Sequence, residues 1–330
     1  MTKIIHYFAI LLMCACCFNC SSSAGKIPVI IDTDANNEVD DQHAMAYLFM
    51  NGKTFDVKGV TVNATFSGGK IDEQYAEAYR IVRLCNLTGL PVKKGADGFF
   101  ETIAPNVSQA DFDGREAVNF IIAQAKAMKK EKLVVIAVGK LTNVALAIKK
   151  DPSITDKIRL VWLGSNYPEP GEYNLENDIP SMNYLLDTNI AFEMVTVRYG
   201  KPSGTSAVIA FKKDILQKMP GKGPVAKEPV TGRHGKTFQC FGDYSVNLFE
   251  ECENHGNPPG RSLFDMAAVA IVKKPSWAEV KTIPAPIMQG KRWVERPNNK
   301  RTIKLWENFN IEAIMNDFYR TMEQYTLVKL

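Results

Sequence analysis

The sequence lacks the features that mark several classes of protein. Beyond its N-terminal segment, none of the 330 residues belong to an apolar run of 18, so no later membrane span is expected. It has no large charge excess, because 40 Lys and Arg face 36 Asp and Glu, and a net charge of +4 is too small to indicate a nucleic-acid polymer as partner. It contains no low-complexity tract, internal repeat or linker. With 45% apolar residues, it is predicted to form one globular domain.

Cysteine is scarce outside the first twenty residues. The remaining Cys85, Cys240 and Cys252 make no disulfide framework and do not have the spacing of zinc ligands. An oxidising compartment would permit a bridge between Cys240 and Cys252, with free thiols as the alternative. The pair Gly68-Gly69 lacks the surroundings of a dinucleotide-binding motif.

The N-terminus has the composition of an export signal. A basic start precedes the unbroken apolar run Tyr7–Phe18, which is short for a membrane span. Cys20 then precedes three serines, an arrangement that resembles a bacterial lipoprotein cleavage site. We therefore expect residues 1–19 to be a signal peptide, Cys20 to be lipidated, residues 20–26 to be a tether and residues 27–330 to be the folded domain.

This interpretation predicts a periplasmic or cell-surface protein that touches the membrane only through its lipid anchor. Phe18 and Asn19 are larger than the residues usual before such a cysteine. Secretion as a soluble protein therefore remains the alternative.

From Lys26 onward, short segments rich in Val and Ile alternate with amphipathic helical patterns. This alternation predicts an α/β domain with an open, mostly parallel central sheet flanked by helices. The expected strands are Ile27–Ile31, Val57–Asn63, Val92–Gly95, Leu133–Val138, Ile158–Leu163, Ser206–Phe211 and Val280–Ile283. The first expected helix begins near Gln42. The others are Asp72–Leu87, Arg115–Met128, Leu141–Lys149, Thr188–Arg198, Phe238–Glu251, Phe264–Lys273 and Ile311–Tyr325. Residues 166–181 and 220–235 are predicted loops.

Five carboxylates lie within ten residues directly after the first predicted strand: Asp32, Asp34, Glu38, Asp40 and Asp41. In open α/β sheets, ligands bind beyond the carboxyl ends of the strands. Carboxylates this close raise one another's pKa unless a cation offsets their charge. Oxygen ligands without His or Cys suit Ca²⁺ or Mg²⁺. A helix cap within a solvated acidic loop is the simpler alternative, but five acids after an apolar strand favour a cation site.

Four segments carry motifs that share an order with one enzyme family. Asp32-Thr-Asp34 is followed by Asp40-Asp41 and an apolar helix, and later come Val134–Ala147, Asn183–Asp187 and Phe264–Ala270. Together these segments, which extend from Ile27 to about Lys274, resemble the inosine–uridine preferring nucleoside hydrolases. The resemblance implies that family's Rossmann-like α/β fold and hydrolysis of a ribonucleoside or related pentoside to the sugar and the base.

The resemblance also implies a Ca²⁺ cofactor. Its ligands would be Asp34, Asp41, the carbonyl of Thr142 and Asp265, and Asp34 would also be the general base. This chemistry is coherent, because a cation lowers the pKa of water and a carboxylate takes the released proton. The transition state is oxocarbenium-like, so nearby carboxylates stabilise it.

Two residues are implied to bind the ribose hydroxyls, Asp40 and Asn183, and Asp32 is implied to be a supporting carboxylate. The partner would be a small-molecule nucleoside or pentoside. Members of the family are commonly dimers or tetramers, so the resemblance also suggests a homodimer or homotetramer.

Three features depart from the family pattern. Five residues, Ala35–Val39, stand where three are usual, so Glu38 could enter the site. The acid usual two residues before the ribose-binding asparagine is Ser181 here, before Asn183. A histidine that can protonate the leaving base usually precedes the late aspartate, but this chain has Phe264.

Other residues could fill these roles. His234 and His255, both in polar stretches, are candidates for the acid that protonates the leaving group. Asn174 and Asn177 are both candidates for a further substrate-binding asparagine. Asn63, which ends the second predicted strand, is a candidate at the mouth of the site, with a turn residue as the alternative.

Two other functions remain open from the sequence. The chain could be a non-catalytic lipoprotein of the same fold that binds a nucleoside or sugar, since Ser181 and Phe264 replace expected residues. Asp32-Thr-Asp34 after a strand also resembles the motif of haloacid-dehalogenase-type phosphatases, in which Asp32 would attack phosphate. That motif does not explain Asp40-Asp41 or Leu141-Thr142-Asn143.

Overall fold

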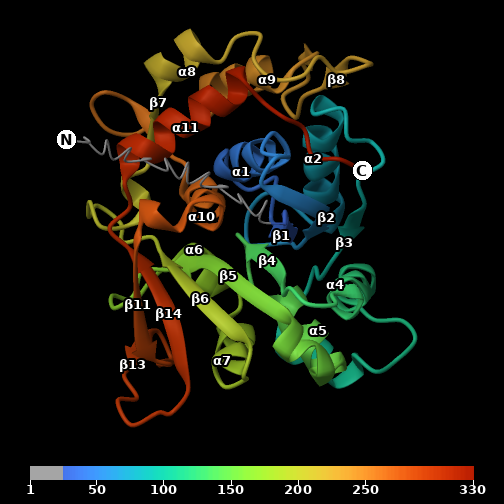
Figure 1. The fold of residues 1–330 in the computed structure, drawn as a ribbon, viewed down its shortest axis with the longest axis vertical. Coiled ribbons are helices and arrows are strands. Elements are labelled where there is room, and N and C mark those ends of the chain that lie inside the picture. Colours follow the sequence, from blue (N-terminus) through green and yellow to red (C-terminus); the bar gives the residue numbers. More distant parts are fainter. Residues whose placement is uncertain (1–24) are drawn as a thin grey trace, which may run out of the picture.

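A computed structural model describes residues 25–330 of the chain (Figure 1). The expected signal peptide, Cys20 and nearly all of the expected tether lie outside these residues and stay predictions. Within the described part, no helix is long and apolar enough to cross a membrane. Cys85, Cys240 and Cys252 are all free thiols, so Cys240 and Cys252 are not bridged.

An eight-stranded sheet forms the centre of the domain, in the order β11-β14-β6-β5-β4-β1-β2-β3 (Figure 1). All neighbouring strands are parallel except the antiparallel pair β11 and β14 at one edge. The expected open, mostly parallel α/β sheet is confirmed. Its strands are β1 (Ile27–Thr33), β2 (Phe55–Val62), β3 (Val92–Lys94), β4 (Leu133–Ala137), β5 (Ile158–Ser165), β6 (Ala191–Thr196), β11 (Glu279–Pro284) and β14 (Thr302–Glu307).

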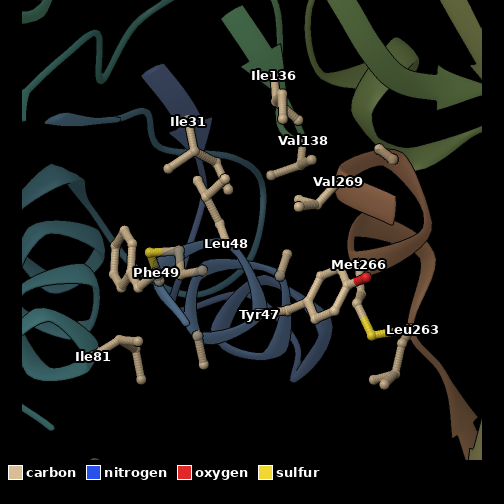
Figure 2. Close-up of a cluster of buried hydrophobic side chains, with 14 of the residues drawn as sticks. Ile31, Tyr47, Leu48, Phe49, Ile81, Ile136, Val138, Leu263, Met266 and Val269 are labelled. Atoms are coloured by element: carbon tan, nitrogen blue, oxygen red, sulfur yellow. The ribbon is translucent and has the colours of Figure 1, made fainter. Parts of the chain in front are cut away.

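Helices cover both faces of this sheet because its central strands are apolar on both sides. In β4, Val134 and Ile136 join one hydrophobic cluster, and Val135 and Ala137 join the other. The first cluster, part of which is shown in Figure 2, includes residues of α1 (Asp40–Phe49), α2 (Ile71–Leu84), α8 (Lys212–Lys218), α9 (Phe241–Glu251), α10 (Phe264–Lys273) and α11 (Ile311–Glu323). The second includes residues of α3 (Phe100–Ile103), α4 (Arg115–Ala127), α5 (Thr142–Lys150), α6 (Tyr173–Asn177) and α7 (Ile179–Leu186).

Short elements lie outside the main sheet. Three antiparallel pairs are formed by β7 (Ile209–Phe211) with β10 (Gly260–Ser262), β8 (Val230–Thr231) with β9 (Thr237–Phe238), and β12 (Ile287–Gln289) with β13 (Arg292–Val294). Four 3₁₀ turns cover Ala104–Asn106, Pro152–Lys157, Thr205–Ala207 and Pro275–Trp277. The β8–β9 hairpin includes part of the predicted 220–235 loop, and β7 is shorter than the strand predicted there.

The strand order reverses between β1 and β4. The chain continues from β1 to β2 and β3 on one side, and from β4 to β5 and β6 on the other. Segments that leave β1 and β4 therefore diverge, and a crevice opens beyond the carboxyl ends of these strands. The acidic loop Asp34–Val39 begins in this crevice, directly after β1.

Two of the sequence predictions for the sheet were wrong. The predicted helix Thr188–Arg198 is β6, whose Phe192–Thr196 residues are buried between β5 and β14. Its β-branched and aromatic residues fit a pleated, two-sided environment better than an amphipathic helix. Strand β14 was not predicted, although buried Ile303 and Leu305 alternate with exposed Thr302 and Lys304.

A buried carboxylate joins three helices and the acidic loop. Glu77 of α2 accepts hydrogen bonds from Gln42 of α1 at 3.1 Å and from Tyr244 of α9 at 2.6 Å. Its side chain is fully buried and forms an ion pair with Arg80. Gln42 also donates to the carbonyl of Ala35 at 2.8 Å. The network therefore ties the acidic loop to the helix layer.

Loss of this carboxylate should destabilise the fold. We expect Glu77→Ala to lower the free energy of unfolding by about 3 kcal/mol, because it removes one partner of a buried ion pair and leaves the other charge uncompensated. Urea denaturation measures the change, with Glu101→Ala on the exposed face of α3 as control. A loss under about 1 kcal/mol, as at an ordinary surface position, would contradict this role.

Candidate active site

The acidic loop lines a cavity of about 370 Å³ at the carboxyl ends of the strands. Its wall combines carboxylates with hydroxyls, two amides and a few apolar side chains. The carboxylates that line it are Asp34, Glu38, Asp40, Asp41, Glu172 and Asp265. Four of the five acids clustered between Asp32 and Asp41 therefore meet the late aspartate, Asp265, in one place.

Two helix N-termini place three of these acids. Asp40 and Asp41 are the first residues of α1, and Asp265 lies in the first turn of α10. Helices α1 and α10 pack against each other in the first hydrophobic cluster. The first turn of a helix carries a partial positive charge and unpaired N–H groups, so a carboxylate there is stabilised. The sequence thus folds the two segments so that their acids converge.

These acids form a candidate cation site. One carboxylate oxygen from each of Asp40, Asp41 and Asp265 lies within 4.8 Å of the others, and all three side chains are buried. Burial, followed by the charge of Glu38, raises the pKa of Asp40 to about 7. Burial and neighbouring carboxylates raise the pKa of Asp41 and of Asp265 well above the usual range. A buried set of oxygen ligands with excess negative charge fits a hard divalent cation such as Ca²⁺.

Asp34 lies beside this cluster and has the properties of a proton acceptor. It is buried at the pocket wall, and the Thr65 hydroxyl donates to its Oδ2 at 2.5 Å. Burial raises the pKa of Asp34 to about 6. A carboxylate with a pKa near neutrality can take a proton from water and release it again at physiological pH.

Asp32 lies behind the pocket and does not line it. Its carboxylate accepts hydrogen bonds from Thr61 at 2.6 Å, Asn143 at 2.7 Å and Asn63 at 3.2 Å. Burial raises the pKa of Asp32 to about 7. These contacts suit the predicted supporting role. They exclude Asp32 as a phosphatase nucleophile in this structure, because no substrate reaches a fully buried carboxylate surrounded by three donors.

The structure does not bring Thr142 or Asn183 into the pocket. Thr142 begins α5, and its hydroxyl donates to Asp178, while Val138 is the residue of this segment that lines the pocket. Asn183 lies on α7, and its amide pairs with the backbone of Met288 at 2.8 and 2.9 Å. Neither residue lines the pocket, and the Thr142 hydroxyl and the Asn183 amide are engaged elsewhere in the fold.

Among the other predicted residues, Asn174 and His255 line the pocket. Asn63 sits just behind it, with its Nδ2 on Asp32. Asn177 does not line it, because its amide bonds the backbone of Phe66 and of Tyr173. His234 is exposed near the tip of the β8–β9 hairpin and is also absent from the lining, so the structure gives it no contact with the site.

Sequence reasoning missed Glu172, although a signal was present. Glu172 is buried, lines the pocket and stands two residues before Asn174, which is the acid-to-asparagine spacing sought at Ser181 and Asn183. Burial raises the pKa of Glu172 to about 7. Asn174 donates to the carbonyls of Val138 at 2.9 Å and Leu163 at 3.1 Å, so its side chain is held at the ends of β4 and β5.

Comparison with known proteins agrees with this arrangement. The sequence profile of the inosine-uridine preferring nucleoside hydrolases matches residues 29–316, which is most of the chain. The chain belongs to this family.

Individual relatives of the nucleoside hydrolase family are distant. The chain is 22% identical over 181 residues to the inosine-uridine preferring nucleoside hydrolase of Crithidia fasciculata, covering 49% of this chain and 55% of that protein. It is 28% identical over 207 residues to uridine nucleosidase 1 of Arabidopsis thaliana, covering 57% of this chain and 54% of that protein. The chain thus spans little more than half the length of these curated relatives.

Solved nucleoside hydrolase structures share the fold. A plant nucleoside hydrolase gives a TM-score of 0.71 at 17% identity, covering 91% of this chain and all of the other. The purine-preferring ribonucleoside hydrolase from Gardnerella vaginalis gives a TM-score of 0.66 at 20% identity, covering 89% of this chain and 98% of the other. These likenesses confirm the expected fold class.

Two features set this nucleoside hydrolase family member apart from the pattern expected above. The acidic turn carries two extra residues, and Glu38 from this turn pairs across the pocket with Arg261 of β10. Arg233 holds the same turn from outside, donating to the carbonyl of Glu38 at 2.9 Å. Phe264 lines the pocket where the pattern has a histidine, and its ring meets Tyr199 edge-on at 6.0 Å.

The raised pKa of Asp34 makes a prediction about stability. In the folded chain this pKa is about 6, against 3.8 for a free carboxyl. The stability that the group contributes is therefore present below about pH 4 and is lost as the pH rises through 6. In chelator, we expect Asp34→Asn to be more stable than the unsubstituted chain at pH 8 by about 1 to 3 kcal/mol.

Urea denaturation at pH 4 and pH 8 measures this difference, which should vanish at the lower pH. Asp111→Asn, at a position where 89% of the side chain is exposed, serves as control. A difference independent of pH would show that Asp34 carries no raised pKa.

Proposed function

We propose that this chain hydrolyses the N-glycosidic bond of a ribonucleoside or related pentoside, releasing the free sugar and the base, with Ca²⁺ as cofactor. The observation that carries the proposal is the convergence of Asp40, Asp41 and Asp265 on one buried point beside Asp34. Family membership supports the reaction class, and the cavity of about 370 Å³ is of a size suited to one small substrate.

The residues that would hold the cation are Asp40, Asp41 and Asp265, with Asp34 close by. When bound, the cation would lower the pKa of a water molecule and fix the sugar hydroxyls. Asp34 would accept the proton of that water as its oxygen attacks C1′. The carboxylates around C1′ would stabilise the positive charge that develops on the sugar ring.

Asn174, Glu172 and Asp40 would bind the sugar. Glu172 caps α6 and Asn174 lies in its first turn, and both line the same pocket as the acidic loop, so a substrate in the pocket would contact both segments. Both amide protons of Asn174 are donated to backbone carbonyls, which directs its Oδ1 as an acceptor for a sugar hydroxyl. Asn183 is not assigned to the sugar, because its amide group forms two hydrogen bonds with the backbone of Met288.

Removal of divalent cations should abolish activity. We expect the chain to release reducing sugar from inosine or uridine, to lose this activity in EGTA and to regain it when Ca²⁺ is restored. Asp34→Asn should lower kcat by about 10²-fold or more, because general-base catalysis is lost. Activity that survives both chelation and Asp34→Asn would refute the mechanism. Tight nucleoside binding without turnover over a long incubation would instead indicate a non-catalytic binder.

A pair of asparagines tests the sugar site. We expect Asn174→Ala to lower kcat/KM by about 10²-fold, because hydrogen bonds to the sugar hydroxyls strengthen in the transition state and contribute several kcal/mol. The matched control Asn183→Ala should change kcat/KM less than about 3-fold, since this residue bonds only the backbone of Met288. Steady-state kinetics with one nucleoside measures both. A larger loss for Asn183→Ala would restore the sugar site first expected from the sequence.

A further inference from the structure

Cleavage of an N-glycosidic bond leaves both bonding electrons on the base nitrogen. This charge needs a proton or a strong hydrogen-bond donor nearby. Phe264 can supply neither. Another group that lines the pocket must therefore take up this charge if the chain cleaves nucleosides.

Arg261 is the one arginine or lysine among the described residues that line the pocket. It lies on β10, three residues before Phe264, and only 13% of its side chain is exposed. Glu38, which also lines the pocket, pairs with its Nη2. The longer acidic turn thus brings a carboxylate to a guanidinium that lines the same pocket as Phe264.

The hydrogen bonds of Arg261 leave part of its guanidinium available. Its Nη1 donates to the carbonyl of Glu253 at 3.1 Å and to Nε2 of His255 at 2.9 Å, and its Nη2 donates to Glu38. Three of its five N–H groups are thereby paired within the described chain. The others remain to donate to a ligand in the pocket, and the fixed pairs hold the fork in place.

The same contacts argue against Nε2 of His255 as the proton donor, and Nδ1 lies 3.8 Å from the carboxylate of Glu253. A nitrogen that accepts a hydrogen bond from a guanidinium carries no proton of its own. The Nε2 of His255 is therefore an acceptor in this network, and 61% of the side chain is exposed to solvent. The imidazole serves here as one of the groups that hold Arg261.

We propose that Arg261 binds the leaving base and stabilises it as an anion, and that Glu38 is a positioning residue that holds the guanidinium. This inference rests on the proposed function. In the step, water oxygen bonds to C1′ and its proton passes to Asp34. The C1′–N bond breaks with both electrons on the base nitrogen. Arg261 donates hydrogen bonds to the base without losing a proton, and solvent protonates the base afterwards.

Two substrates with the same sugar test the role. Hypoxanthine leaving from inosine needs stabilisation, whereas p-nitrophenolate leaving from p-nitrophenyl β-D-riboside needs little. We expect Arg261→Gln to lower kcat/KM for inosine by about 10²-fold, as when one charge-stabilising donor is removed, and to change the aryl riboside less than about 5-fold. Arg261→Lys should recover part of the loss. Glu38→Gln should lower the ratio of kcat/KM for inosine to kcat/KM for the aryl riboside by a smaller factor. A purely structural role of Glu38 would not change this ratio.

His255→Gln tests the alternative donor. The matched control is His234→Gln, at an exposed position outside the pocket lining. It should leave the ratio of the two substrates within about 3-fold of its original value. Circular dichroism and thermal unfolding establish that each variant is folded, and Arg261→Lys replaces Arg261→Gln in the comparison if the latter does not fold.

The outcomes separate the inference from the proposed function. Equal losses on both substrates for Arg261→Gln would overturn the inference, as would a selective loss for His255→Gln alone. If the unsubstituted chain hydrolysed the aryl riboside but no nucleoside, the inference about Arg261 would also be overturned. The chain would then still be an enzyme that cleaves ribosides. Hydrolysis of neither substrate with Ca²⁺ present would refute the proposed function itself.

Discussion

Crowding of buried negative charge is the constraint on which this structure depends. Asp40, Asp41 and Asp265 are removed from water and brought within 4.8 Å, where like charges repel most strongly. Helix N-termini offset part of this cost, and the Thr33 hydroxyl donates to Asp41. These dipoles are fixed in the fold and cannot neutralise three full charges. The remaining imbalance is a property of the folded chain that favours a cation or protons.

The scaffold around the site is built to hold such an arrangement. The carboxylates lie beyond the ends of β1 and β4, the most enclosed part of the sheet, where strands pair on both sides. Asp32 is satisfied by three donors, and Glu77 fastens the acidic loop to three helices. Gly139 completes the packing, since a Cβ there would lie 2.8 Å from the Asn63 side chain and 2.9 Å from Asp34. A rigid frame keeps repelling groups from moving apart, which is how strain is retained at functional sites.

The sequence predicts best what depends on local composition. Central strands β4 and β5 were found because buried parallel strands are continuously apolar, and the acidic loop because five acids follow such a strand. Strand β6 was mistaken for a helix, since its pairing with β14 joins segments over 100 residues apart. Asn183 was expected to bind the ribose hydroxyls, and Asn174 was only one of two candidates for a further substrate contact. Both asparagines precede apolar helical residues, and only the path of the chain past β5 decides which faces the pocket. The Glu38–Arg261 pair, separated by 223 positions, has no local signal at all.

The departures from the family pattern are linked in space, although they lie far apart in sequence. The longer turn supplies Glu38, Glu38 meets Arg261, and Arg261 precedes the phenylalanine that stands in the place of a histidine. Each departure alone would look like a loss: an irregular turn, or a missing proton donor. A buried arginine without a partner would be costly, and an extra carboxylate in an acidic pocket would be costly as well. Together they cancel each other's charge and leave a guanidinium directed at the pocket. The turn, the carboxylate and the arginine are therefore one linked unit, in which the longer turn carries Glu38 and Glu38 holds a guanidinium that lines the same pocket as Phe264.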